Sequence, residues 1–144
     1  MRYISLLLCL FTLSCAAADS DWYFGTWEVS DAEFPGMSAM GMEQAETWFG
    51  SELTYTPAKV AFRDERCDSP TFTTSSLTGD EFYASYRATL QALGIAGEQV
   101  EIVEVGCPDN WIAAGSKMIK AGSDSAYILW DGVFFRVEKQ ASGS

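Results

Sequence analysis

The sequence predicts an α+β domain: a mostly antiparallel sheet or small barrel of seven to eight strands with two short helices. Short runs of β-branched and aromatic residues alternate with turn residues through most of the chain. Asp131-Gly132 separates two such runs, and this dipeptide favours a type I′ hairpin turn because both positions need a positive φ. Thr78-Gly79-Asp80-Glu81 is a capping box, which marks the start of a helix.

The β-prone runs follow one another at short intervals. The first run ends at residues 31–36, where Pro35-Gly36 predicts a turn. In the fifth, Val100 and Ile102 are out of phase with Val103 and Val105, which indicates either a bulge or a strand covered on both faces. The expected strands are residues 23–29, 53–56, 60–63, 71–75, 99–105, 117–121, 126–130 and 133–138.

Two segments have helical spacing. The first begins near Ser38 and ends at Gly50, which stands where a helix C-cap is expected. The second begins at the capping box and ends at Gly94, with Ile95 placed to fold back onto it. The apolar positions are Met42, Ala45, Trp48 and Phe49 in the first, and Phe82, Tyr86, Leu90 and Leu93 in the second.

The N-terminal residues have the pattern of a secretory signal. Arg2 precedes an apolar run over residues 3–13, which is too short to span a bilayer, and Ala16-Ala17-Ala18 supplies small residues for cleavage. We therefore expect a signal peptide over residues 1–18, one exported globular domain over residues 19–140, and a flexible tail over residues 141–144. The expected location is periplasmic or extracellular, with no membrane span.

The N-terminal signal has a second interpretation, in which the protein carries a lipid anchor. Ser14-Cys15-Ala16 is similar to the end of a bacterial lipoprotein signal, in which Cys15 is acylated and the protein is held at the outer membrane. Thr12 stands where that signal usually has Leu, Val or Ile. We therefore prefer cleavage before Asp19 and keep acylation of Cys15 as the alternative.

Charge and composition exclude several classes of function. The chain has 20 acidic and nine basic residues, and its net charge of −11 becomes −12 once Arg2 is removed. This charge disfavours nucleic acid and anionic membranes and favours a basic partner. There is no histidine, which removes the commonest general base and metal ligand. We expect no catalytic residues, no metal, no cofactor and no enzymatic activity.

The domain after the signal has two cysteines, Cys67 and Cys107. In an exported protein such a pair predicts a disulfide. A redox or metal-binding role needs CxxC spacing or histidine partners, and the sequence has neither. The bond is therefore expected to be structural.

Gly25-Thr26-Trp27 in the first expected strand resembles the G-x-W opening of the lipocalins and related calycin barrels. In that family the tryptophan closes one end of the barrel, and an arginine from the last strand stacks across its ring. The resemblance implies that Gly25, Trp27 and Arg136 form a barrel-end cluster. It also implies a barrel that can hold a small apolar ligand.

Two functional hypotheses follow. The preferred one is a non-enzymatic exported protein that binds a small apolar ligand in a calycin-like barrel. The alternative is an acidic inhibitor or immunity-type protein that binds a basic extracytoplasmic hydrolase such as a lysozyme. Candidate contact residues are Trp48, beside a methionine-rich segment, and Trp111, in a turn after Cys107. Apolar side chains around a cavity favour the first hypothesis, and a filled core favours the second.

Overall fold

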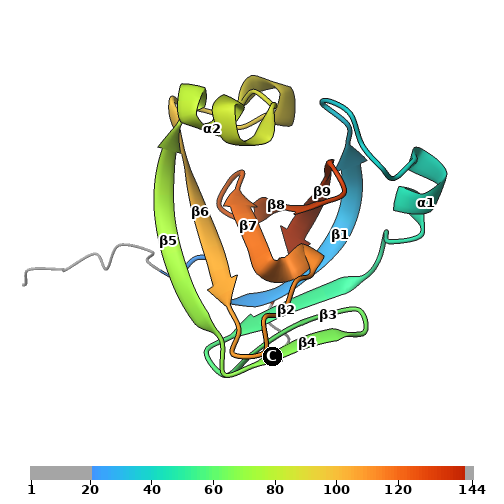
Figure 1. The fold of residues 1–144 in the computed structure, drawn as a ribbon, viewed down its shortest axis with the longest axis vertical. Helices are drawn as coiled ribbons and strands as arrows, with labels where there is room; N and C mark the ends of the chain where they lie inside the picture. The colour runs from blue at the N-terminus through green and yellow to red at the C-terminus, as the bar shows by residue number, and fades with distance from the viewer. Residues whose placement is uncertain (1–20, 142–144) are drawn as a thin grey trace, which may run out of the picture.

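Nine antiparallel strands form one sheet that curls into a half-barrel (Figure 1). The computed structural model describes residues 21–141, so the expected signal peptide and the Cys15 alternative lie outside the described residues. The order across the sheet is β4-β3-β2-β1-β9-β8-β7-β6-β5. The strands are β1 Gly25–Glu33, β2 Glu52–Thr56, β3 Lys59–Phe62, β4 Glu65–Asp68, β5 Thr71–Thr78, β6 Gln99–Gly106, β7 Lys117–Lys120, β8 Ser125–Trp130 and β9 Val133–Lys139.

The sequence predicted seven to eight strands, whereas the described residues form nine. The strand that was not predicted is β4. Its sequence is Glu-Arg-Cys-Asp, and Cys67 is its one buried residue. A short, charged edge strand is a common way to protect the edge of a sheet, but it lacks the apolar alternation that marks a strand in a sequence. Among residues 21–141, β4 pairs only with β3 and β5 pairs only with β6, so the sheet that these residues form does not close on itself.

The first strand also continues further than the turn residues predicted. β1 runs through Asp31 to Glu33, where an interruption was expected. Its pairing with β9 shifts register between Val29 and Asp31, which leaves Ser30 as an extra residue in the strand. Such a bulge bends a strand and increases its twist, so β1 follows the curl of the sheet instead of ending there.

Strand β6 is covered on both faces, which settles the two interpretations of its phase change. Its pairing with β5 is continuous from Gln99 to Gly106, so no bulge is present. Val103 and Val105 face the concave side of the sheet, whereas Val100 and Ile102 pack in a second apolar cluster on the other face. A sheet with two buried faces has apolar residues in both phases.

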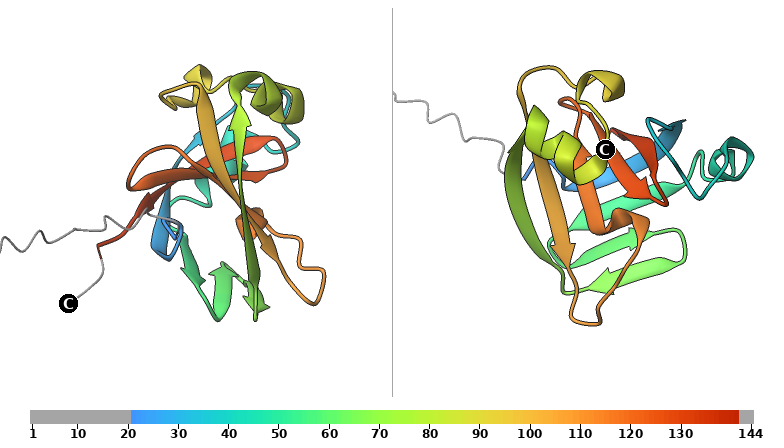
Figure 2. Two further views of the ribbon diagram at one scale, coloured as in Figure 1. Left: turned by 90° about the vertical axis from the view of Figure 1, so that its left-hand side faces the viewer. Right: turned by 45° about the horizontal axis from the view of Figure 1, so that its top comes forward.

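The second cluster lies under α2 (Gly79–Tyr86) and the short 3₁₀ helix η1 (Gln91–Leu93). The capping box is present: Thr78 Oγ1 accepts from the Glu81 N–H at 3.3 Å, and a Glu81 carboxylate oxygen accepts from the Thr78 N–H at 2.8 Å. The helix ends earlier than expected, because Arg87 adopts a left-handed φ of 56°. Leu90 and Leu93 still reach the cluster, from the turn and η1. α2 lies at one end of the half-barrel, away from α1 (Met42–Glu46) (Figures 1 and 2).

Side chains fill the concave side of the half-barrel. Trp27, Leu53, Tyr55, Met118 and Phe135 lie there, each with a relative exposure of 0%. The Tyr55 hydroxyl donates to the Gly115 carbonyl, and burial raises the pKa of this hydroxyl above its usual value. The centre of the half-barrel is therefore a packed core.

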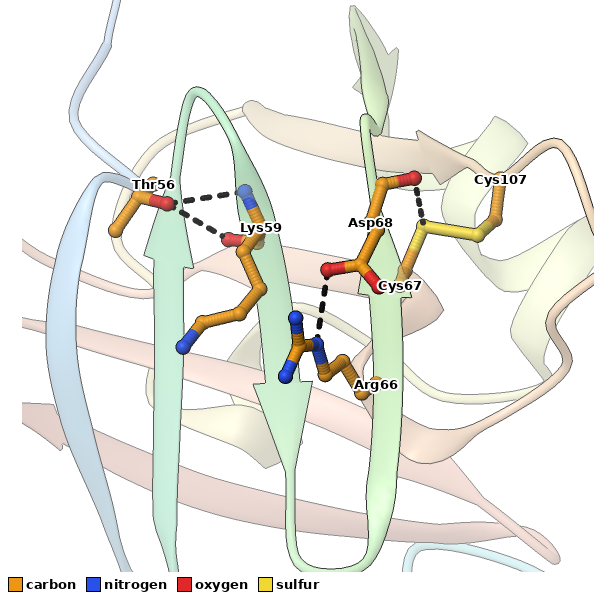
Figure 3. A network of polar contacts seen from close by, with 6 residues as sticks. All are labelled: Thr56, Lys59, Arg66, Cys67, Asp68 and Cys107. Carbon is orange, nitrogen blue, oxygen red and sulfur yellow. Dashed lines mark hydrogen bonds and ion pairs between the residues drawn. A yellow bond between two sulfur atoms is a disulfide. The ribbon is translucent and has the colours of Figure 1, made fainter.

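The expected disulfide between Cys67 and Cys107 is confirmed, with the two Cα atoms 5.9 Å apart. It joins β4 at one edge of the sheet to the end of β6, next to the other edge (Figure 3). The nearby ion pair between Arg66 and Asp68, at 2.8 Å, is mostly exposed on both sides and contributes little stability. Both of its residues lie in β4, so it does not connect the two edges, whereas the disulfide does, beside the ring contact of Tyr55 with Phe72.

Replacing both cysteines by serine should lower the free energy of unfolding by about 3–4 kcal/mol, because the bond closes a long loop in the unfolded chain. Urea denaturation of the wild type and of the double variant measures the difference. Reductant should destabilise the wild type by a similar amount and leave the variant unchanged. A loss below about 1 kcal/mol would contradict a structural role for the bond.

Gly132→Ala should also be destabilising, by on the order of 1–3 kcal/mol. Gly132 has a φ of 82°, and a Cβ there would lie 2.5 Å from the backbone oxygen of Met37. Gly36→Ala is the matched control, since a Cβ at Gly36 meets nothing within 4 Å. Urea denaturation compares the two variants, and equal stabilities would show that the 34–41 segment does not pack on this hairpin.

Candidate functional site

Trp27 is fully buried at one end of the half-barrel. Its indole N–H donates to the carbonyl of Tyr23 at 3.0 Å, and its ring makes an edge contact with Trp22. The cation over the ring is the Lys139 ammonium, 5.2 Å from the ring centroid. Lys139 comes from β9 and lies directly opposite Trp27 in the β1–β9 pairing.

Arg136 does not join Gly25 and Trp27, contrary to the cluster expected from the sequence. Side chains alternate across a strand, so Val137 and Lys139 share one face of β9 and Arg136 lies on the other. Its guanidinium is 5.9 Å from the centroid of the Tyr127 ring, in the second cluster. A hydrogen bond with the Tyr127 hydroxyl raises the pKa of Arg136.

Gly25 makes room for the lysine. A Cβ at Gly25 would lie 3.0 Å from Cε of Lys139, and its φ of 136° also favours glycine. With that space open, the Lys139 ammonium reaches the carbonyl of Trp22 and donates to it at 2.7 Å. The cluster of Gly25, Trp27 and Lys139 therefore ties the chain before β1 to the last strand, which is a structural role.

A surface cleft of about 240 Å³ lies where apolar and charged side chains meet, and its lining residue Phe62 shares a face of the sheet with Leu53 and Trp27. Trp48 and Trp130 contribute its indole rings, and Asp64 and Glu65 contribute carboxylates. The remaining residues around the cleft are Phe62, Arg63, Ile112, Ala113 and Ala114. We name this site the Trp48–Trp130 cleft.

Two walls of the cleft are tied together by the disulfide. One wall is the turn between β3 and β4, two residues before Cys67. The other is the segment from Ile112 to Ala114, which follows Cys107. Gly115 lets this second wall approach the core, because a Cβ there would lie 2.9 Å from Cδ1 of Leu53. The disulfide therefore restrains the position of the two walls relative to each other.

Arg63 stands on the cleft with its guanidinium 5.1 Å from the centroid of the Trp48 ring. Trp48 also stacks on Phe135 at 4.5 Å between centroids and contacts Phe62 at 5.4 Å. Arg63 has a φ of 52°, a left-handed conformation that costs on the order of 1 kcal/mol in a residue of this type. This turn therefore holds a cation against an indole at some cost in backbone strain.

The two candidate contact residues behave differently. Trp48 lines the cleft and is half-buried. Trp111 packs against the core and is not among the residues that line the cleft. Its neighbour Ile112 is the exposed residue of this turn, at 78%. Residue type alone favours Trp111 over Ile112 as a contact residue, because large aromatic residues are the usual contact residues, but Trp111 is half-buried and Ile112 is exposed.

Trp130 and Phe62 were assigned to expected strands, with a core role preferred for Trp130, and nothing in the sequence connected Phe62 or Ile112 with Trp48. These four residues come from β3, β8 and two loops that are far apart in the chain. The methionine-rich segment gives a mixed result: Met40 is buried, whereas Met37 is 99% exposed. The segment is held to the hairpin after Trp130 by the Ala39 N–H, which donates to the Asp131 carbonyl at 2.9 Å.

Two carboxylates line the cleft beside these apolar residues. Asp64 and Glu65 have no Lys or Arg nitrogen within 4 Å among residues 21–141. On the other face of β1 and β2 from Phe62, Glu28 lies directly opposite Glu52 on one side and Glu138 on the other, and Arg136 pairs with Glu138 at 3.5 Å. Like charges directly opposite one another are destabilising.

Two further properties concern the described part of the chain. Within residues 21–141, no helix is long and apolar enough to cross a membrane. The same residues hold no group of three or more His, Cys, Asp or Glu side chains arranged to bind a metal ion. No protein family model, curated protein or solved structure matches this chain, so its function has to be argued from the site.

Lys139→Met should lower the free energy of unfolding by about 1–2 kcal/mol, because it removes a charged hydrogen bond and a cation–π contact. Lys59→Met is the matched control, since no hydrogen bond or ion pair of the Lys59 ammonium is present in residues 21–141. Thermal and urea unfolding of both variants measure the difference. Equal losses of stability in the two variants would show that the contacts of Lys139 do not stabilise this end of the half-barrel.

Proposed function

We propose that this protein is a non-enzymatic, exported binding protein that captures a basic protein outside the cytoplasm, as an inhibitor or immunity-type protein does. The observation that carries the proposal is the Trp48–Trp130 cleft. An exposed Ile112 and two indoles stand there beside carboxylates that have no cationic partner in the described residues. Apolar anchors surrounded by charged groups are typical of protein interfaces.

The packed core supports this proposal over binding of a small apolar ligand. A calycin-like barrel that holds a ligand needs space between its walls, and the concave side here is occupied by Trp27, Tyr55, Phe135 and their neighbours. The surface cleft, at about 240 Å³, is smaller than the ~300–1,000 Å³ of pockets for drug-sized ligands. A protein partner needs no enclosed space.

The charge of the molecule supports a basic partner. The net charge of −11 creates a negative potential that raises the rate of encounter with a basic protein. The row of Glu52, Glu28 and Glu138 across three neighbouring strands concentrates part of that charge on one surface. Only Glu138 in this row has a cation within 4 Å in the described residues, namely Arg136 at 3.5 Å.

The disulfide supports the exported location. Disulfides persist in oxidising compartments such as the periplasm and the extracellular space. Cys67 and Cys107 are bonded, and the signal-like N-terminus of the sequence agrees with this placement. Basic hydrolases that attack the cell envelope, lysozymes above all, are partners of suitable charge in those compartments.

The proposal predicts binding to a basic lysozyme that weakens steeply with salt. Across a panel of lysozymes of different isoelectric points, affinity should rise with the positive charge of the lysozyme. The association rate constant for lysozyme binding should fall about tenfold between about 50 mM and about 500 mM salt, because salt screens the electrostatic steering of the two proteins toward each other. Biosensor kinetics and lysozyme activity assays measure both effects.

An acidic protein of similar size serves as the control for non-specific charge effects on the lysozyme. The proposal fails if no basic protein in the panel binds. It also fails if native mass spectrometry of the protein from its host shows a retained apolar molecule while lysozymes remain unbound.

A further inference from the structure

We infer that the Trp48–Trp130 cleft receives one arginine or lysine side chain of the partner, an inference that rests on the proposed basic partner. Four features of the cleft carry the inference. They are its size, the Trp130 indole, which has no ring or cation partner in residues 21–141, the carboxylates at its edge, and the existing contact of Arg63 with the Trp48 ring. Each is present in residues that already line the cleft.

The size of the cleft suits a side chain. Its volume of about 240 Å³ lies below the range of pockets that enclose a drug-sized molecule. Ile112, Ala113 and Ala114 form an apolar wall against which the methylene stem of a long cationic side chain can pack. Only the charged end then needs polar partners.

Trp130 provides an indole for the charged end. It is half-buried and lines the cleft, and in the described part of the chain its ring stacks on no other ring and has no cation over it. Trp48, by contrast, has Phe135 and Arg63 as ring partners. Trp130 is therefore the ring of the cleft that is open to a cation–π contact with a ligand.

Asp64 and Glu65 provide the charge complement. Both line the cleft, and neither carboxylate has a Lys or Arg nitrogen within 4 Å in residues 21–141. A guanidinium or ammonium group on Trp130 can be neutralised by these carboxylates, and a guanidinium can donate its forked N–H groups to the carboxylate oxygens.

Arg63 shows that this cleft accommodates a cation on an indole. Its guanidinium lies 5.1 Å from the centroid of the Trp48 ring, and its left-handed φ is typical of the first residue of a two-residue hairpin turn such as that between β3 and β4. Arg63 offsets one of the two carboxylate charges, so the cleft retains a net negative charge for an incoming cation. An anionic side chain would meet Asp64 and Glu65 and be repelled.

The test uses the full disulfide-bonded protein and N-acetyl-arginine amide as the probe, so it needs no identified partner. The control probe is N-acetyl-citrulline amide, which has a closely similar shape and no charge. Indole N–H signals in ¹H–¹⁵N spectra report binding at each tryptophan. The arginine probe should shift the Trp130 signal saturably, with an affinity roughly fivefold above that of the citrulline probe, and leave the Trp27 signal unchanged.

The paired variant D64N/E65Q should reduce the affinity for the arginine probe to that of the citrulline probe. D124N/E98Q, which removes the same charge from exposed acids outside the cleft, should change it little. Equal affinity for both probes, absence of saturation at Trp130, or equal effects of the two paired variants would overturn the inference. Because lysozyme binding is measured separately, failure of the cleft and failure of the proposed function are distinguishable.

Discussion

The bond between Cys67 and Cys107 joins an edge strand of the sheet to the strand next to the opposite edge. The edge strands β4 and β5 do not pair, so hydrogen bonds do not close the half-barrel as they close a complete barrel. The disulfide supplies the missing connection at one end. The lysine of the Gly25, Trp27 and Lys139 cluster supplies a second connection, between the chain before β1 and the end of β9. These two links add to the apolar core, in which side chains from both halves of the sheet, such as Tyr55 and Val103, pack together.

The curl produces two apolar clusters and leaves no large space between them. The concave side is packed with aromatic and aliphatic side chains, and the other face of β6 to β9 is covered by α2 and η1. A domain that buries both faces of a sheet can devote few apolar residues to an internal cavity. An exposed apolar residue such as Ile112 therefore stands out, and it lies in the cleft between the two loops that the disulfide joins.

Much of the fold could be predicted from local signals. The capping box at Thr78, the Asp131-Gly132 turn and the cysteine pair each act over short range or through chemistry specific to the residue, and all three are present. β4 could not be predicted, because a charged edge strand is stabilised by its neighbour β3 and not by its own pattern. Arg136 was placed on the wrong face, because a bulge and the pairing register decide which cation of the last strand reaches Trp27.

The candidate site shows the same division between local and tertiary information. Trp48 was recognised by its residue type, but Trp130, Phe62 and Ile112 are brought to it from separate parts of the chain by the curl of the sheet. The sequence by itself determined the acidic charge, the disulfide, and most of the helix and strand segments, since composition and short-range contacts are written in consecutive residues. Only the tertiary structure decided that the core is filled and that the cleft exists, because both depend on which distant side chains share one face.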